Sequence, residues 1–170
     1  MTPWRMEIDV SAHGTLTWRG HRVRCALGRG GVRRDKREGD GGTPIGCFPL
    51  RRVFYRRDRI TPPPTALAVT PIEPDDGWCD DPAHPAYNQP VLLPFAGSHE
   101  RLWREDGLYD LLAVIGWNDD PVVPGLGSAI FLHVARPDYA PTEGCVAVAL
   151  GDLSELLAAC RPGDRIRIGL

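Results

Sequence analysis

The sequence predicts a single, mainly β domain: a β-sandwich or small barrel with one short helix near its C-terminal end. The 19 glycines and 17 prolines are about 21% of the 170 residues, against an average of roughly 12%, which favours many turns and few long helices. The apolar runs have the length of strands, and only one segment has helical periodicity. The length suits one domain, residues 1–170, with a core of its own.

The first strands are expected as a hairpin. Residues 14–19 and 21–27 alternate between apolar and polar side chains and meet at Gly20, which is the pattern of two antiparallel strands joined by a tight turn. Residues 29–42 follow as a charged, glycine-rich loop that we expect to be too polar to bury.

The middle of the chain supplies four further strands and one long loop. Residues 44–55 and 66–72 have strand patterns, whereas residues 71–90 are rich in proline and acidic residues and predict a long surface excursion. Residues 108–117 and 128–135 are continuous apolar runs, which suit central strands covered on both faces. Long loops between such strands are commonly binding loops or lids.

The C-terminal part supplies the helix and a last strand. Residues 152–160 have apolar residues on one face, and Asp152 with Glu155 forms a start that resembles a capping box. Residues 165–168 then alternate as a terminal strand.

Charge is divided sharply along the chain. Residues 19–59 contain thirteen Arg or Lys against four acidic residues, and residues 60–120 contain two against eleven. We expect the two parts to fold against each other, and because no RNA-binding or helix-turn-helix pattern is present we expect no nucleic-acid partner. No apolar run approaches the length of a membrane span, so we expect no membrane insertion, and we expect a monomer.

The five cysteines show no zinc-site spacing and no Cys-x-x-Cys, so no metal or other cofactor is expected. Cys25, Cys47 and Cys160 lie in apolar or strand-like contexts, and Cys79 lies among acidic residues that disfavour a thiolate. Cys145 differs because a glycine precedes it, and we expect it to be the most reactive thiol.

Cys145 has a potential partner in His133, which ends an apolar strand twelve positions earlier. An imidazole can accept the proton of a thiol nucleophile, and the backbone N–H groups of Gly144 and Cys145 can stabilise an oxyanion. On chemistry alone this pair is a weak signal, and a histidine at a strand end with a buried structural cysteine is the favoured interpretation.

A family resemblance decides between these interpretations. His133, a loop, and then Thr142-Glu143-Gly144-Cys145-Val146 resembles the active-site signature of the L,D-transpeptidases with a YkuD-like domain. The segment 37–46, which contains Thr-Pro-Ile-Gly, resembles the second signature of that family. Glu143 and Ala147 depart from the usual pattern, so the chain resembles a divergent branch.

The resemblance implies an enzyme with an L,D-transpeptidase-like β-sandwich or barrel that acts on peptidoglycan stem peptides, both donor and acceptor, and is a carbapenem target. Cys145 would form a thioester with release of a D-amino acid, His133 would move the proton, and Gly144 would serve the oxyanion. The alternatives are an L,D-carboxypeptidase, a sortase-like transpeptidase and a non-catalytic wall-binding module.

Substrate-binding candidates follow from the same resemblance and from position along the strands. They are Thr142, Glu143, Tyr109, Trp117, Asn118, Arg34 and Lys36. Each has an ordinary structural alternative in core packing, a turn or a solvated loop.

Crosslinking takes place outside the cytoplasmic membrane, so the implied location is periplasmic. The segment 1–10 lacks a signal-peptide pattern, and we therefore expect export through a signal outside this sequence or by an atypical route. A cytoplasmic enzyme that trims recycled muropeptides is the alternative.

Overall fold

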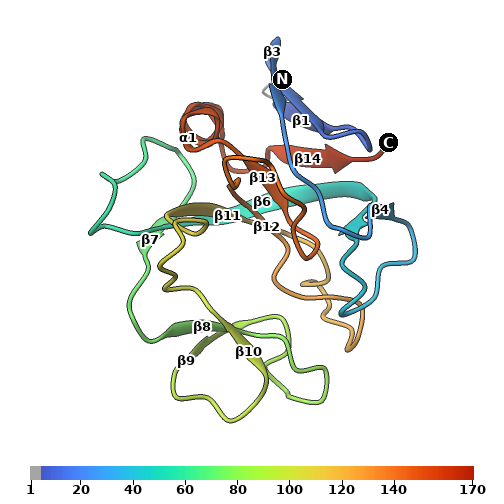
Figure 1. Cartoon of the computed structure of the whole chain (residues 1–170), viewed down its shortest axis with the longest axis vertical. Coiled ribbons are helices and arrows are strands. Elements are labelled where there is room, and N and C mark those ends of the chain that lie inside the picture. Colours follow the sequence, from blue (N-terminus) through green and yellow to red (C-terminus); the bar gives the residue numbers. More distant parts are fainter. Residues whose placement is uncertain (1–4) are drawn as a thin grey trace.

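The computed structural model describes residues 5–170, and it confirms a mainly β fold with one helix (Figure 1). The strands are β1 (Glu7–Val10), β2 (Thr15–Trp18), β3 (His21–Arg24), β4 (Val32–Arg33), β5 (Thr43–Pro44), β6 (Gly46–Tyr55), β7 (Val69–Pro71), β8 (Asp76–Cys79), β9 (Pro90–Leu92), β10 (His99–Arg101), β11 (Leu111–Ile115), β12 (Phe131–Val134), β13 (Val146–Val148) and β14 (Arg165–Ile168). The helix is α1 (Leu150–Ala159).

The main sheet curls into a nearly closed barrel. Its strand order is β13-β12-β11-β6-β14-β1-β2-β3, with β7 beside β6. The long strand β6 joins the two halves, because its first part pairs with β14 and its second part with β11. The two outer edges meet where Ala26, just after β3, exchanges backbone hydrogen bonds of 2.8 and 3.0 Å with Ala147 in β13.

Most of the expected elements are present, and two strands of the main sheet were missed. The hairpin is confirmed as β2 and β3, and each apolar run from residue 44 onward contains an observed strand. The missed strand β1 alternates exposed and buried residues and pairs in parallel with β14. The missed strand β13 has only three residues and begins directly after Cys145.

The helix begins two residues earlier than the capping pattern predicts. Its N-cap is Ala149, which has no side chain able to cap, and Asp152 lies within the first turn. The capping-box prediction was therefore wrong. The apolar face is as expected, since Leu153, Leu156 and Leu157 are fully buried in the main core. Each such leucine contributes about 1.5–3 kcal/mol by leaving water, which holds the helix in place without a cap.

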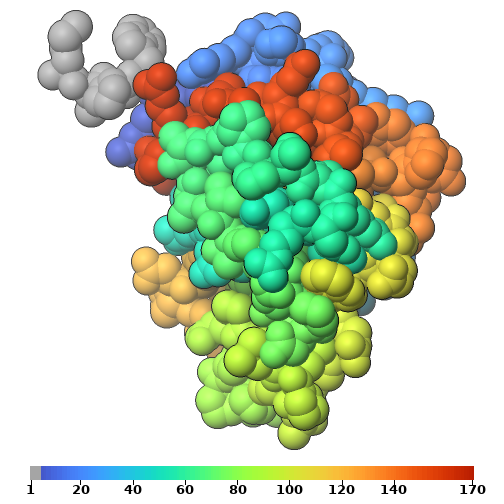
Figure 2. Space-filling model, turned by 90° about the vertical axis from the view of Figure 1, so that its left-hand side faces the viewer, coloured from blue at the N-terminus to red at the C-terminus, as the bar shows by residue number. Residues whose placement is uncertain are grey.

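Residues 71–90 are not simply a surface excursion. They contribute β8 to a small three-stranded sheet of order β10-β8-β9, which forms the lower lobe in Figure 1 and tapers to the bottom of the molecule in Figure 2. Ile72, Trp78 and Tyr87 are buried. These apolar residues are spaced widely among prolines and acidic residues. The average composition of the segment is therefore polar, although these three side chains are buried.

The charged loop 29–42 also departs from expectation. Lys36, the only lysine of the chain, is buried, and its ammonium donates to Asp40 at 2.7 Å and to the Arg37 carbonyl at 2.8 Å. A buried ammonium is tolerated when it is paired and hydrogen-bonded, so the expectation that this loop is too polar to bury was wrong at this position.

The two oppositely charged parts of the chain do fold against each other. Ion pairs join Arg51 to Asp119 at 2.9 Å and Arg59 to Asp110 at 3.0 Å. Several positive side chains of residues 19–59 are thereby matched by acidic groups of residues 60–120, and the charge division need not indicate an external partner.

Candidate functional site

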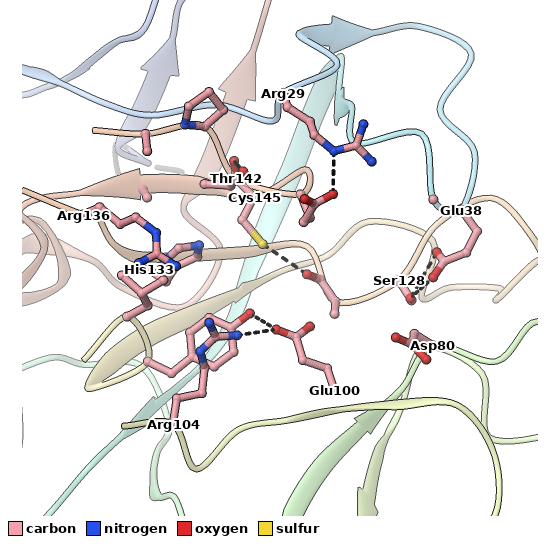
Figure 3. Close-up of a pocket in the computed structure, with 18 of the residues that line it drawn as sticks. Arg29, Glu38, Asp80, Glu100, Arg104, Ser128, His133, Arg136, Thr142 and Cys145 are labelled. Atoms are coloured by element: carbon pink, nitrogen blue, oxygen red, sulfur yellow. Dashed lines mark hydrogen bonds and ion pairs between the residues drawn. The ribbon is translucent and has the colours of Figure 1, made fainter. Parts of the chain in front are cut away.

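A pocket of about 370 Å³ contains both Cys145 and His133 (Figure 3). Four parts of the chain line it: the charged loop 29–39, the lobe and the segment after it through residues 80–109, the strand β12 with the residues before it, and the turn 140–145. Residues distant in the sequence thus meet around one thiol.

The Cys145 sulfur is held by the backbone that leads into β12. Its thiol donates to the Ala129 carbonyl at 3.2 Å, and the Phe131 N–H donates to Sγ at 3.3 Å. Ala129 has a positive φ of 53°, a conformation that non-glycine residues seldom adopt, and this bend aims its carbonyl at the thiol. Burial raises the pKa of Cys145 to about 12, so the resting group is a protonated thiol.

His133 presents one ring nitrogen to the backbone. Its Nδ1 lies 2.9 Å from the Val134 carbonyl, and because a carbonyl only accepts, Nδ1 carries the proton and Nε2 is the basic nitrogen of the neutral ring. The ring packs edge-on against Tyr109 with centroids 5.3 Å apart. Burial lowers the pKa of His133 to about 4, which keeps the imidazole neutral and able to accept a proton.

The turn before the cysteine is organised by Thr142. Its hydroxyl donates to the Cys145 carbonyl at 2.7 Å and accepts from the Gly144 N–H at 3.1 Å. The Gly144 amide is therefore already hydrogen-bonded in this structure, and its service to an oxyanion stays a prediction. The Cys145 N–H donates no hydrogen bond to any other residue in 5–170, so it is the amide available for that role.

Gly144 is required by close backbone packing. Its φ is 134°, and a Cβ there would lie 2.8 Å from the Gly42 carbonyl oxygen. Gly28 packs on the same turn, since a Cβ on it would lie 2.9 Å from the Gly144 Cα. The Gly28 N–H donates to the Thr43 hydroxyl at 2.9 Å. The second sequence signature thus supports the turn that carries the cysteine.

A polar cluster lies beneath the reactive pair. The Tyr109 hydroxyl donates to Glu100, and the Arg104 guanidinium lies 3.6 Å from the same carboxylate and 4.9 Å from the centre of the Tyr109 ring. Burial raises the pKa of Glu100. The tyrosine therefore links the histidine to a carboxylate of the lobe.

Most of the residues proposed from the sequence line this pocket. They are Cys145, His133, Thr142, Glu143, Tyr109 and Lys36. Glu143 is largely exposed and pairs with Arg29 at 2.8 Å. Gly144 is adjacent, in the turn itself.

Three proposed substrate-binding residues lie outside the pocket lining. Trp117 donates from Nε1 to the Leu126 carbonyl at 3.1 Å, and Asn118 bonds the backbone of Val123 and Gly127. Both side chains brace the loop before β12. Arg34 is exposed on the charged loop.

Sequence reasoning missed Asn88, a buried residue that joins three segments. Its side-chain oxygen accepts from the Trp78 indole and from the Ala129 N–H, both at 3.0 Å. Its amide group donates to the carbonyls of Trp117 and Asn118 at 3.0 and 2.8 Å. All four hydrogen-bonding positions are satisfied, and the residue fixes the backbone that contacts the cysteine. No local motif marks it.

Charged residues of the pocket wall were also missed, above all Glu100, Arg104 and Arg136. They come from the lobe, from the segment after it and from the loop that follows β12, and only the tertiary fold brings them together. No group of three or more His, Cys, Asp or Glu side chains within residues 5–170 is arranged to hold a metal ion.

Comparison with known proteins gives a family match over nearly the whole chain. A family model described as the L,D-transpeptidase catalytic domain, YkuD, matches residues 3–168. No curated protein shows significant sequence similarity. Two solved structures are similar at low identity: L,D-transpeptidase 1 of Mycobacterium tuberculosis (14% identity, TM-score 0.44) and an L,D-transpeptidase of Mycobacterium smegmatis (11%, TM-score 0.44). Each match covers 96% of this chain and 58% of the solved one.

Proposed function

Because the chain belongs to the L,D-transpeptidase catalytic-domain family, we propose that it transfers acyl groups between peptidoglycan stem peptides through a thioester on Cys145. The observation that carries this proposal is the shared pocket of a buried thiol and a histidine whose Nε2 is free to accept a proton. The site residues and their roles are part of the proposal.

The first half of the reaction forms the thioester. Cys145 Sγ attacks the carbonyl carbon of the donor peptide while its proton passes to His133 Nε2. The Cys145 N–H donates to the oxygen that becomes negative. As the C–N bond breaks, His133 returns the proton to the departing amine, and a D-amino acid leaves.

The resting state must be activated by substrate. With the pKa of Cys145 near 12 and that of His133 near 4, a thiolate–imidazolium pair is strongly disfavoured in the empty pocket. Proton transfer therefore accompanies attack on the carbonyl, when negative charge moves from sulfur to an oxygen that the backbone amide stabilises.

The second half resolves the thioester with an amine of another stem peptide. His133 accepts a proton from that amine, the amide bond forms, and Cys145 regains its hydrogen. Transfer is proposed as the main outcome and hydrolysis as the minor one, because the pocket wall carries acidic groups, Asp80 among them, that attract a cationic acceptor.

The cellular location of the enzyme is inferred from where its proposed substrate is found. Stem peptides are crosslinked outside the cytoplasmic membrane, so we propose that the enzyme works in the periplasm. No helix within residues 5–170 is long and apolar enough to cross a membrane. Fractionation of the host is expected to recover the native protein in the periplasm, and confinement to the cytosol would support the trimming of recycled muropeptides.

Mass spectrometry tests the function directly. Incubation with purified muropeptides is expected to give crosslinked dimers or exchanged terminal D-amino acids, and a carbapenem is expected to acylate Cys145. The Cys145→Ser variant serves as the control for the mapped adduct. Shortened stem peptides alone, at high acceptor concentration, would indicate an L,D-carboxypeptidase.

Two other results point to the remaining alternatives. Turnover of sorting-signal peptides in place of muropeptides would indicate a sortase-like enzyme. Binding to peptidoglycan with no acylation of any cysteine would indicate a non-catalytic wall-binding module.

A further inference from the structure

The orientation of the His133 ring depends on two contacts. Its Nδ1 bonds the carbonyl of Val134, the next residue along the chain, at 2.9 Å. This hydrogen bond fixes one edge of the imidazole. Within residues 5–170, the aromatic ring that packs against the imidazole is Tyr109, edge-on with centroids 5.3 Å apart. Tyr109 is therefore the side chain that limits where the rest of the His133 ring can turn.

Tyr109 is itself held on three sides. Its ring packs edge-on against Phe131 with centroids 5.6 Å apart, and the Arg104 guanidinium lies 4.9 Å from the ring centre. Its hydroxyl donates to the Glu100 carboxylate. Burial raises the pKa of Tyr109, so the hydroxyl keeps its proton and remains a donor. The one polar anchor of this ring is thus a carboxylate from another part of the chain.

Glu100 belongs to β10 of the lobe, and Figure 3 shows its side chain beneath Cys145 and His133. Its backbone pairs with Trp78 in β8, and the Trp78 ring packs edge-on against Phe131 at 5.1 Å. The Arg104 guanidinium lies 3.6 Å from the carboxylate. The lobe sheet and this arginine together fix the carboxylate that anchors the tyrosine.

We propose that Glu100 is a positioning residue for acyl transfer: its carboxylate holds the Tyr109 hydroxyl, and the Tyr109 ring holds His133 where it can accept the thiol proton. This inference rests on the proposed function and adds a residue of the lobe to it. Neither Glu100 nor Tyr109 exchanges a proton with the substrate. What the site requires at position 100 is a hydrogen-bond acceptor.

Matched substitutions separate the acceptor from the charge. Glu100→Ala removes the acceptor, whereas Glu100→Gln keeps a carbonyl oxygen that accepts from a hydroxyl. Tyr109→Phe removes the hydroxyl and keeps the ring. The controls are Glu155→Ala, at an exposed position, and Tyr139→Phe, whose hydroxyl has no hydrogen-bond partner within residues 5–170. Both control positions lie outside the pocket lining.

The first measurement is the nitrogen-15 NMR spectrum of the His133 ring in the free protein. The wild type and Glu100→Gln are expected to show one tautomer, with the proton on Nδ1, because the ring stays on the Val134 carbonyl. Glu100→Ala and Tyr109→Phe are expected to show both tautomers, because a ring that turns loses this hydrogen bond. A single tautomer in every variant would overturn the proposal.

The second measurement is the rate of acylation of Cys145 by a carbapenem. Glu100→Ala and Tyr109→Phe are each expected to lower this rate by roughly tenfold, the scale of one hydrogen bond, and Glu100→Gln is expected to restore it. The double variant with Ala at 100 and Phe at 109 is expected to match either single one, because both changes break the same contact. Multiplied losses in the double variant, or an equal loss in Glu100→Gln, would contradict the proposal.

The spectrum and the acylation rate separate this inference from the proposed function, because the NMR measurement needs no turnover. Mixed tautomers in Glu100→Ala, with no acylation of the wild type, would retain the positioning and reject the transpeptidase. Acylation of the wild type, at rates that all the variants share, would retain the transpeptidase and reject the positioning. Urea unfolding of each variant verifies that it is folded, and Glu100→Gln and Tyr109→Phe test the proposal where Glu100→Ala is not.

Discussion

His133 and Cys145, the proposed base and nucleophile, are both buried, and burial governs the pKa of each. It lowers the pKa of His133 to about 4 and raises that of Cys145 to about 12. The imidazole is a base only when neutral, so kcat/KM is expected to hold from neutral pH down to about pH 5 and to fall by half near pH 4. A pH–rate profile measures this, with circular dichroism at each pH to exclude unfolding; an acid limb near pH 6.5 would contradict it.

Because Cys145 is buried, the prediction of which cysteine reacts first with a simple alkylating agent changes. Cys145 is 7% exposed with its thiol protonated, whereas Cys47 is partly exposed. Since the thiolate is the nucleophile, iodoacetamide is expected to modify Cys47 before Cys145 in the free protein. Peptide mapping over time checks this, and faster modification of Cys145 would restore the prediction made from the sequence.

Two glycines allow a matched comparison. Gly144→Ala forces a Cβ to within 2.8 Å of the Gly42 carbonyl at a φ of 134°, whereas Gly151→Ala on α1 meets no atom within 4 Å. The first change is expected to destabilise the fold by about 1–3 kcal/mol and to abolish acylation. The second is expected to stabilise it by about 0.5–1 kcal/mol. Urea unfolding and carbapenem acylation measure both; similar effects of the two substitutions would show that the packing at Gly144 is unimportant.

At the scale of elements, Asn88 connects the lobe to the strand that holds the thiol. Asn88→Asp replaces the amide that donates to the Trp117 and Asn118 carbonyls with an acceptor. We expect a loss of about 2–4 kcal/mol in the free energy of unfolding and a loss of activity. Gln89→Glu makes the same chemical change at an exposed neighbour. Equal urea midpoints for both variants would refute the role of Asn88.

The sequence predicted those elements whose formation depends on residues that are neighbours along the chain. The β2–β3 hairpin follows from alternation around Gly20, and the buried strands follow from their apolar runs. The pair His133 and Cys145 was found because its residues lie in recognisable motifs. Most charged residues of the pocket wall were not found, since Glu100, Arg104 and Arg136 belong to separate segments that only the tertiary fold brings to the thiol.

For the whole molecule, a monomer is expected. Among residues 5–170, the large apolar side chains that are exposed are separated in the chain: Leu92, Val123, Leu150 and Leu170. A stable dimer needs a contiguous apolar patch. Light scattering after size exclusion is expected to give the mass of one chain, 18.7 kDa. A concentration-dependent doubling of that mass would contradict this.

The strand order also constrains the order of assembly during synthesis. The strands β1, β2 and β3 join the rest of the barrel through β14 and through the contact of Ala26 with Ala147, both of which involve residues made late. The hairpin leaves the ribosome first, yet its permanent neighbours emerge more than a hundred residues afterwards. The barrel is therefore expected to close only after β13 and β14 have been synthesised.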